Sequence, residues 1–247
     1  MSSTGVTDQD VRQMMAIATY HGAANDDGLP WDLLHMLKDL VECDILSVSG
    51  QDTPAWDFFL EQQLPGQQWS PSFEAAVADA YREHYWTSTC SHPDRTGDVV
   101  AVTRDSDLLR DRAYRSTGMY ADFDRLVGVE HEIRLCLDTG TPQRTVRLLF
   151  TRGSGSDFSD RDLAVLTLLR PHLQAAFTVA QRRRGPSPLT ARQREILRYV
   201  SAGYTNGQIS RRLALSEATV RKHLENIFAR LGVTSRTAAV ARLDPPV

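Results

Sequence analysis

Hydrophobic side chains recur at helical spacing near the start of the chain and alternate with polar ones in its middle. In Asp8–His21 and Pro30–Val41 the apolar positions fall three or four residues apart, which predicts two amphipathic helices. Glu130–Leu137 and Arg144–Phe150 alternate instead, and the intervening "DTGT" favours a β-hairpin. Shorter stretches predict strands at Ile45–Ser49, Trp56–Leu60 and Val99–Thr103, a helix at Ser72–Trp86 followed by a polar loop, and a helical start to Leu108–Tyr120. The pattern predicts an α+β domain with short antiparallel strands flanked by helices.

The longest predicted helix is Ser159–Arg184. It opens on "SDRD", a capping-box pattern with Ser159 as N-cap, and it contains Pro171, which should kink or interrupt it. One set of positions is compatible either with a seam between two chains or with packing on the chain's own sheet: Leu163, Leu166, Arg170, Leu173, Phe177 and Ala180. Arg170 weakens the seam, and the pattern alone leaves both interpretations open.

Four short helices with clear boundaries are predicted after residue 188, which indicates a small all-α domain. Each begins on a hydroxyl-bearing N-cap, and two end on a glycine suited to a left-handed C-terminal residue. The caps are Thr190, Thr205, Ser216 and Ser235, and the glycines are Gly203 and Gly232. A tight turn joins the second and third helices, an arrangement typical of a helix-turn-helix.

The third of these helices carries the most informative pattern, "SEATVRKHLENIFARLGV". Its apolar stripe consists of Val220, Leu224, Ile227 and Leu231, which should face a core. The opposite side then presents Thr219, Lys222, His223, Asn226 and Arg230, with Arg221 and Glu225 on the flanks. A DNA major groove admits one α-helix, and such side chains can contact base edges or phosphates. The pattern therefore predicts a DNA-recognition helix.

The charge distribution supports the same interpretation. The formal net charge of the 247 residues is −3, yet residues 182–247 hold 13 Lys and Arg against 4 Asp and Glu, and the preceding residues hold 15 against 27. A basic segment on an acidic body favours a polyanion-binding module. The stretch "QRRRGPSP" at Gln181–Pro188 is typical of a linker. We therefore expect domains at 1–181 and 189–247, joined by a linker at 182–188.

Composition narrows the function classes. Hydrophobic residues make up 41% and charged residues 24%, values typical of a soluble globular protein. The polar start and the lack of an apolar stretch near 20 residues predict neither a signal peptide nor a membrane span, and three scattered cysteines suit a reducing cytoplasm. Common catalytic motifs are absent, and His84, Cys90 and His92 lack an established metal-ligand spacing. We expect no catalytic residue, metal or cofactor.

Residues 189–243 resemble the C-terminal DNA-binding domain of the LuxR/NarL family of bacterial transcription factors. The resemblance is carried by "LTARQREIL", "GYTNGQIS" and "SEATVRKHLENIFARLGVTSRTAAV". It implies that Arg221, Lys222 and Glu225 approach base edges, and that a helix at 235–242 joins a dimer interface. It also implies that a second set lies near phosphates: Thr205, Asn206, Thr219 and His223.

Glu225 departs from the pattern, because many relatives have a non-acidic residue there. A carboxylate repels phosphate but can accept a hydrogen bond from cytosine N4. We therefore expect Glu225 to sharpen sequence selectivity rather than to add affinity.

The segment 8–181 resembles the GAF-like sensor domain of actinobacterial LuxR-type regulators. The resemblance rests on "RTGD", "TGMYADF", "GVEHEI" and "DFSDRDLAVLTLLRPHLQAAF". The sequence disfavours a phosphorylated receiver domain, because its only lysines are Lys38 and Lys222, and neither is placed to contact a phosphoryl group. The Trp, Tyr and Asp residues of an acyl-homoserine-lactone sensor are present as residue types, but they do not align convincingly with that motif. GAF-like folds often enclose a small molecule, for which the candidate wall is Trp56, Trp69, Tyr81, Tyr85 and Trp86. Ordinary core packing would explain these aromatic residues equally well.

The predicted function is that of a cytoplasmic, homodimeric transcriptional regulator that binds double-stranded DNA and responds to a small effector or a partner, with no membrane partner. Two alternatives stay open at this point. One is a protein-interaction regulator that does not touch DNA. The other is a GAF-like thiol redox enzyme, which would need a reactive thiolate at Cys43, Cys90 or Cys136.

Overall fold

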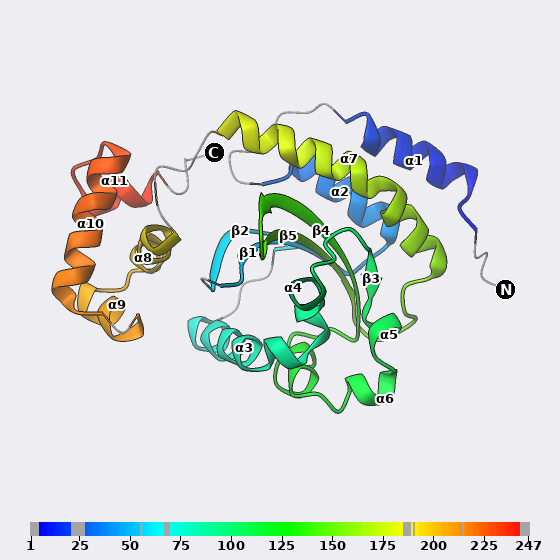
Figure 1. Cartoon of the computed structure of the whole chain (residues 1–247), viewed down its shortest axis with the longest axis horizontal. Coiled ribbons are helices and arrows are strands. Elements are labelled where there is room, and N and C mark those ends of the chain that lie inside the picture. Colours follow the sequence, from blue (N-terminus) through cyan, green and yellow to red (C-terminus); the bar gives the residue numbers. More distant parts are fainter. Residues whose placement is uncertain are drawn as a thin grey trace. The chain divides into compact units, whose positions relative to one another are not determined.

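The computed structural model describes residues 5–20, 28–54, 56–66, 70–184, 189, 191–213 and 215–242. The chain forms two compact units, Met1–Arg183 and Arg184–Val247 (Figure 1). The last helix of the first unit continues to Arg184, into the segment expected to be a linker, and residues 185–188 of that segment lie outside the described residues.

The first unit is built on a five-stranded antiparallel sheet in the order β2-β1-β5-β4-β3. The strands are β1 Ile45–Asp52, β2 Asp57–Leu64, β3 Thr103–Arg104, β4 His131–Thr141 and β5 Arg144–Arg152. The β4–β5 hairpin appears where alternation predicted it, and β1 and β2 each run beyond the predicted end. An α+β architecture with an antiparallel sheet is thereby confirmed.

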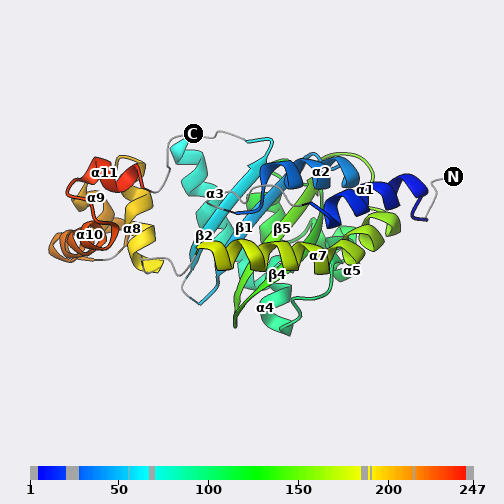
Figure 2. The same cartoon turned by 90° about the horizontal axis from the view of Figure 1, so that it is seen from above.

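Three helices cover one face of this sheet: α1 Asp8–Ala18, α2 Trp31–Val41 and α7 Asp160–Arg184 (Figures 1 and 2). The strands turn alternate apolar residues, such as Leu46, Leu148 and Phe150, towards these helices, and each is fully buried. The helix α1 ends at Ala18, short of the predicted His21, which lies outside the described residues.

The helix α7 is continuous, so Pro171 does not interrupt it. Ser159 caps it as predicted, since the backbone N–H of Asp162 donates to Ser159 Oγ (3.3 Å) and the N–H of Ser159 donates to the Asp162 carboxylate (2.9 Å). By length and composition Asp160–Gln181 is apolar enough to cross a membrane, a test that core helices also pass.

The spaced positions of α7 pack on the chain's own sheet. Leu166, Leu173 and Phe177 belong to the buried core, and Arg170 donates to the carbonyl oxygens of Cys136 (3.1 Å) and Val99 (2.7 Å). These contacts support the interpretation that the stripe packs on the chain's own sheet.

Short helical segments cover the other face of the sheet (Figures 1 and 2). They are α3 Pro71–His84, α4 His92–Thr96, α5 Asp105–Leu108, α6 Asp111–Tyr114, 3₁₀ turns at Tyr85–Thr87 and Thr89–Ser91, and a π-helical turn at Tyr120–Asp124. The predicted polar loop after α3 is thus largely helical.

The predicted strand Val99–Thr103 is wrong except at its last residue, because only Thr103–Arg104 pairs with β4. The reason is local. The backbone N–H groups of Val100 and Ala101 both donate to one oxygen of Asp98 (2.9 Å each), so the side chain of Asp98 replaces a strand partner.

The second unit contains the four predicted helices, α8 Ala191–Ser201, α9 Asn206–Arg212, α10 Glu217–Leu231 and α11 Arg236–Val240. Their buried side chains form a separate core around Ile196, Ile209 and Ile227. The caps at Thr205, Ser216 and Ser235 are confirmed by hydrogen bonds from backbone N–H groups, and Gly203 and Gly232 have φ angles of 83° and 63°. The cap expected at Thr190 lies outside the described residues.

Candidate nucleic-acid interface and ligand site

The helix α10 is oriented by its apolar stripe. Val220 and Ile227 are fully buried, Leu224 is nearly so, and Leu231 is half-buried at the end of the helix. The hydrophobic effect therefore fixes which side of α10 faces solvent. Arg221, as well as most of the residues on the opposite side, is exposed.

The exposed side of α10 carries both signs of charge. Lys222 Nζ lies 3.2 Å from Glu225 Oε2, three residues further along, and both side chains stay largely exposed. Among the described residues, no hydrogen bond or ion pair holds Arg221. Thr219 and Asn226 are exposed and His223 is half-buried. The structure thus exposes the guanidinium of Arg221 and the Lys222–Glu225 pair on the solvent-facing part of α10.

Three of the predicted contact residues are engaged within the domain. Arg230 donates to Gln193 Oε1 on α8 (3.0 Å). Asn206 Oδ1 accepts from Arg236 Nη1 (3.3 Å), and the hydroxyl of Thr205 accepts from the backbone N–H of Gln208 (3.3 Å). Arg230 therefore braces α10 against α8 in this structure.

Arg236 is a residue that pattern reasoning missed. Besides Asn206, its guanidinium contacts the carbonyl oxygen of Tyr204, so it joins the start of α11 to the turn before α9. Arg212 is a second one, because its guanidinium lies 4.7 Å from the ring centroid of Tyr204. The excess of basic residues in the sequence shows where cations are abundant, but it does not show which of them contact other residues of the domain.

In the first unit, the aromatic residues expected to form a ligand wall are largely brought together. The ring of the fully buried Tyr85 lies 5.2 Å from Trp56, 5.5 Å from Tyr81 and 5.2 Å from Trp86, as centroid distances. Trp69 lies outside the described residues. The sequence prediction missed two neighbours of Tyr81, Phe58 (6.2 Å) and Phe123 (5.3 Å).

Next to this cluster the sheet carries a buried arginine, Arg147 on β5, which is 2% exposed. Its Nη2 donates to Asp94 Oδ2 (2.8 Å) and its Nη1 to the carbonyl oxygen of Cys90 (3.1 Å). The hydroxyl of Tyr85 also donates to Asp94. Burial raises the pKa of Tyr85 to about 12, against the opposing effect of Arg147. Tyr85 thus remains a hydrogen-bond donor near neutral pH.

A second buried arginine, Arg134 on β4, is surrounded by acids. It contacts Glu132, lies 3.6 Å from Asp105 Oδ1 and donates to the carbonyl oxygen of Thr89 (2.9 Å). Burial, reinforced by Glu132, raises the pKa of Asp105 to about 7 and that of Asp124 to about 8. One guanidinium cannot neutralise all three acids, so protons take part in the charge balance of this cluster.

The three cysteines offer no activated thiol. Burial raises the pKa of Cys43 to about 11 and raises the pKa values of Cys90 and Cys136 as well, so all three thiols stay protonated at neutral pH. His84 pairs with Asp122 (2.9 Å), and within the described ranges no group of three or more His, Cys, Asp or Glu side chains is arranged to hold a metal ion. The raised pKa values of the buried thiols disfavour the thiol-enzyme alternative, which would need a reactive thiolate.

Comparison with known proteins places the best-supported similarity in the second unit. Residues 187–243 match the family model "Bacterial regulatory proteins, luxR family". A probable transcriptional regulatory protein, SgaR of Hyphomicrobium methylovorum, is 49% identical over 53 residues, 22% of this chain and 25% of the relative. The putative HTH-type regulator YhjB of Escherichia coli strain K12 is 48% identical over 56 residues, 23% of this chain and 28% of the relative.

The matched segment spans about a quarter of the length of these curated relatives. Over the whole chain, a structure of SdiA in complex with octanoyl-rac-glycerol has a TM-score of 0.48 at 16% identity, and covers 98% of this chain and 95% of SdiA. The family match and both regulators fall on α8 to α11. The C-terminal part of the chain therefore carries a helix-turn-helix domain of the luxR family of bacterial regulatory proteins.

Proposed function

We propose that the protein is a sequence-specific DNA-binding transcriptional regulator. The observation that carries this proposal is the luxR-family domain at 187–243, in which α10 buries Val220 and Ile227 and presents Arg221 and Lys222 to solvent. In this geometry Arg221, Lys222 and Glu225 face the base edges of a major groove.

Phosphate contacts supply the affinity. The basic surplus of residues 182–247 attracts the DNA backbone, and Thr205, Asn206, Thr219, His223 and Asn226 offer polar groups around α10. Arg230 helps to position α10 against α8 through its hydrogen bond to Gln193. Binding of this kind weakens as salt rises, because condensed counterions are released on association.

The regulator acts as a homodimer on two half-sites about one helical turn apart, with α11 as part of the interface. Its domains are an effector-responsive, GAF-like domain at 1–181, a linker at 182–188 and the DNA-binding domain at 189–247. The aromatic cluster around Tyr85 is the proposed wall of the effector site. The protein works in the cytoplasm, without catalysis.

The test combines selection and titration. DNA sites are selected from a random library with the full-length protein, and fluorescence anisotropy then compares the wild type with Arg221→Ala and Lys222→Ala. Each variant should lose roughly 1–3 kcal/mol in specific binding and some sequence preference. Arg110→Ala removes an exposed cation of the first unit and serves as the matched control.

If neither variant changes affinity or preference while Arg110→Ala behaves like the wild type, α10 does not read DNA. If the wild type shows no salt-sensitive DNA affinity at all, the protein-interaction alternative takes the place of this proposal.

A further inference from the structure

The side chain of Gln51 on β1 holds an unsatisfied hydrogen-bond donor inside the first unit. Gln51 is fully buried, and its Nε2 has no hydrogen-bond partner among the described residues. Its Oε1 accepts from the hydroxyl of Tyr81 across 3.5 Å, a long and therefore weak contact. A buried amide donor without a partner loses its hydration and gains nothing in return, so such groups are rare in folded proteins. The unsatisfied donor of Gln51 therefore needs an explanation.

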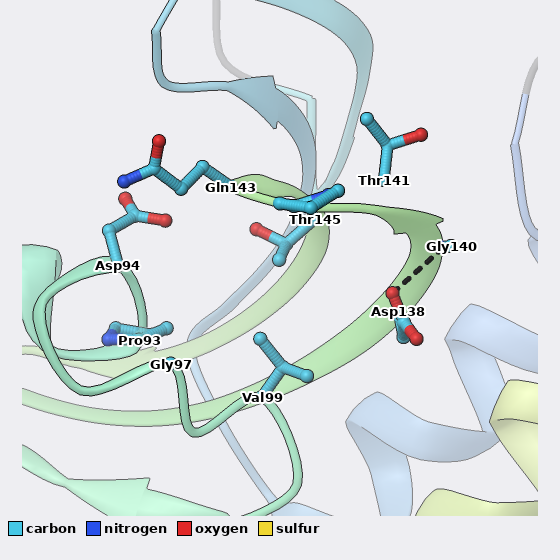
Figure 3. A pocket seen from close by; sticks show the side chains of 10 residues that line it. Pro93, Asp94, Gly97, Val99, Asp138, Gly140, Thr141, Gln143 and Thr145 are labelled. Atoms are coloured by element: carbon cyan, nitrogen blue, oxygen red, sulfur yellow. Dashed lines mark hydrogen bonds between the residues drawn. The ribbon is translucent and has the colours of Figure 1, made fainter.

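The neighbouring polar network does not supply one. Gln51 pairs with Thr145 on β5, whose hydroxyl accepts from Arg147 Nε (3.1 Å). The Nη atoms of Arg147 donate to Asp94 Oδ2 and to the carbonyl oxygen of Cys90. Asp94 and Thr145 also line a pocket of about 370 Å³ (Figure 3), but Gln51 is not one of its lining residues. The amide of Gln51 thus belongs neither to the Arg147 network nor to that pocket.

The amide lies instead beside the proposed effector wall. Phe58 on β2 is the cross-strand partner of Gln51, so both side chains lie on the same face of the sheet. The ring of Tyr81, whose hydroxyl contacts the amide, lies 6.2 Å from the ring of Phe58 and 5.5 Å from that of Tyr85, as centroid distances. One molecule in contact with these rings can therefore reach the amide of Gln51.

This face of β1 is not fully covered by other side chains. Ser47 and Ser49, which share the face with Gln51, are half-buried although β1 lies between two strands, β2 and β5. Leu149, opposite Ser47 on β5, is half-buried as well. Leu46, on the other face of β1, is fully buried. Accessible surface, part polar and part apolar, therefore extends along β1 towards the buried amide.

We infer that Gln51 determines the specificity of the proposed effector site by donating a hydrogen bond from Nε2 to a neutral acceptor oxygen of the effector, namely a carbonyl oxygen. The rest of the effector packs against the rings of Tyr81, Tyr85 and Phe58. The acceptor is neutral, because each nitrogen of Arg147 already donates within the protein and the buried carboxylate of Asp94 repels an anion. This inference rests on the proposed effector site and adds the chemical class of its ligand.

Such a donor makes the site selective. An analogue without the acceptor leaves Nε2 buried and unpaired, so the protein rejects it more strongly than the loss of one hydrogen bond in water would suggest.

The first test measures stability without added ligand. Gln51→Leu replaces the amide with an apolar side chain of similar size and removes the unsatisfied donor, so the thermal midpoint of the full-length variant should equal or exceed that of the wild type. Gln62 is the matched control, because its buried amide bonds to both the N–H and the carbonyl oxygen of Leu29 (2.9 Å each). Gln62→Leu should lower the midpoint. A lower midpoint in Gln51→Leu would show a structural role for Gln51 and overturn the inference.

The second test uses three probes that share a phenyl ring and a similar shape: acetophenone, α-methylstyrene and protonated 1-phenylethylamine. Calorimetry with the full-length protein at constant ionic strength measures their affinities. Acetophenone should bind about fivefold or more tightly than the other two, because α-methylstyrene carries a CH₂ group in place of the carbonyl oxygen and the ammonium group is a donor. Equal affinity for α-methylstyrene, or tighter binding of the amine, contradicts the inference.

Variants separate the role of Gln51 from the existence of the effector site. Gln51→Leu should remove the preference for acetophenone over α-methylstyrene, whereas Gln9→Leu, at an exposed glutamine of α1, should retain it. Trp56→Ala removes part of the aromatic wall and should weaken both probes alike. If both probes bind equally to the wild type and both depend on Trp56, the effector site stands and the role of Gln51 is wrong. If no probe binds saturably, or Trp56→Ala changes nothing, the effector site is wrong and the inference falls with it.

Discussion

The ammonium group of Lys222 lies 3.2 Å from the carboxylate of Glu225, on the solvent-facing side of α10. Because both side chains are largely exposed, water and salt screen this pair, and it adds little stability. Its importance lies in placing opposite charges side by side on the surface proposed to meet DNA. A phosphate favours Lys222 and repels Glu225, whereas the N4 amino group of cytosine favours Glu225.

We predict that Glu225→Gln raises affinity for unselected DNA and relaxes base choice at one position of the site. The variant removes repulsion from phosphates, and it frees Lys222 to act as an additional phosphate contact. Lost discrimination should amount to roughly 1–3 kcal/mol at that position. Anisotropy titrations on selected sites with single-base changes measure it, and an unchanged preference at every position would count against a reading role for Glu225.

Arg230 should behave as a structural residue. Its bond to Gln193 joins α10 to α8, so Arg230→Ala is expected to cost about 1 kcal/mol of unfolding free energy without changing base preference. Gln193→Ala should cost a similar amount. Because the two residues share one interaction, the double variant should be less destabilised than the sum of the single variants. If the losses of unfolding free energy were additive, or if base preference changed, Arg230 would instead be a DNA-contact residue.

The acids around Arg134 predict a pH dependence of stability. Asp105 and Asp124 have raised pKa values in the folded protein, about 7 and about 8, whereas an unfolded Asp has a pKa near 3.9. The folded protein therefore retains protons that the unfolded chain has released. The unfolding free energy of the first unit should fall as pH rises from about 4 to about 8 and level off above that.

Urea unfolding between pH 5 and pH 9 measures this dependence. Asp124→Asn removes one of the titrating groups and should flatten the curve, while the hydrogen bond from Tyr114 (2.9 Å) can still be made to the amide oxygen. Asp122→Asn, an exposed neighbour that pairs with His84, is the control. Stability that stays level or rises over this range in the wild type would be incompatible with buried, protonated acids.

A charged contact at the start of the chain should anchor α1. Arg161 on α7 donates to Asp10, which is 4% exposed, and to the carbonyl oxygen of Leu40 (2.7 Å). Arg161 holds the pKa of Asp10 well below its usual range. Asp10→Asn should destabilise the first unit by about 2 kcal/mol, because hydrogen bonds between charged groups are stronger than neutral ones.

Hydrogen exchange of α1 measures this contact directly. Asp10→Asn should speed exchange throughout α1, whereas Asp8→Asn, an exposed acid in the same first turn, should not. Unchanged exchange in Asp10→Asn would show that hydrophobic packing alone holds the helix.

Local patterns were sufficient for the second unit. Hydroxyl caps, terminal glycines and an apolar stripe are encoded within a few residues of each helix, so Thr205, Ser216 and Gly232 could be placed from the sequence. The orientation of α10 followed from the same stripe. Partners on other helices could not be predicted, because the bond between Arg230 and Gln193 depends on how two helices pack.

The first unit was harder to predict because its unusual features are non-local. Alternation revealed β4 and β5, but it did not show that Arg134 and Arg147 would be fully buried on the polar face of the sheet. Some of their partners are distant in sequence, since Arg134 donates to the carbonyl oxygen of Thr89, 45 residues away, and Arg147 to that of Cys90, 57 residues away. The length of strand β3 was overestimated, because the backbone N–H groups of Val100 and Ala101 donate to the side chain of Asp98 and not to a neighbouring strand.

The most direct test of the central claim is a salt titration of full-length protein on a selected DNA site and on a scrambled site of equal length. The account predicts tighter binding to the selected site at every salt concentration, and affinity for both that falls linearly as log salt rises. It also predicts that Arg221→Ala narrows the difference between the two sites. Equal affinity for both sites, or affinity insensitive to salt, would contradict the claim that α10 recognises DNA.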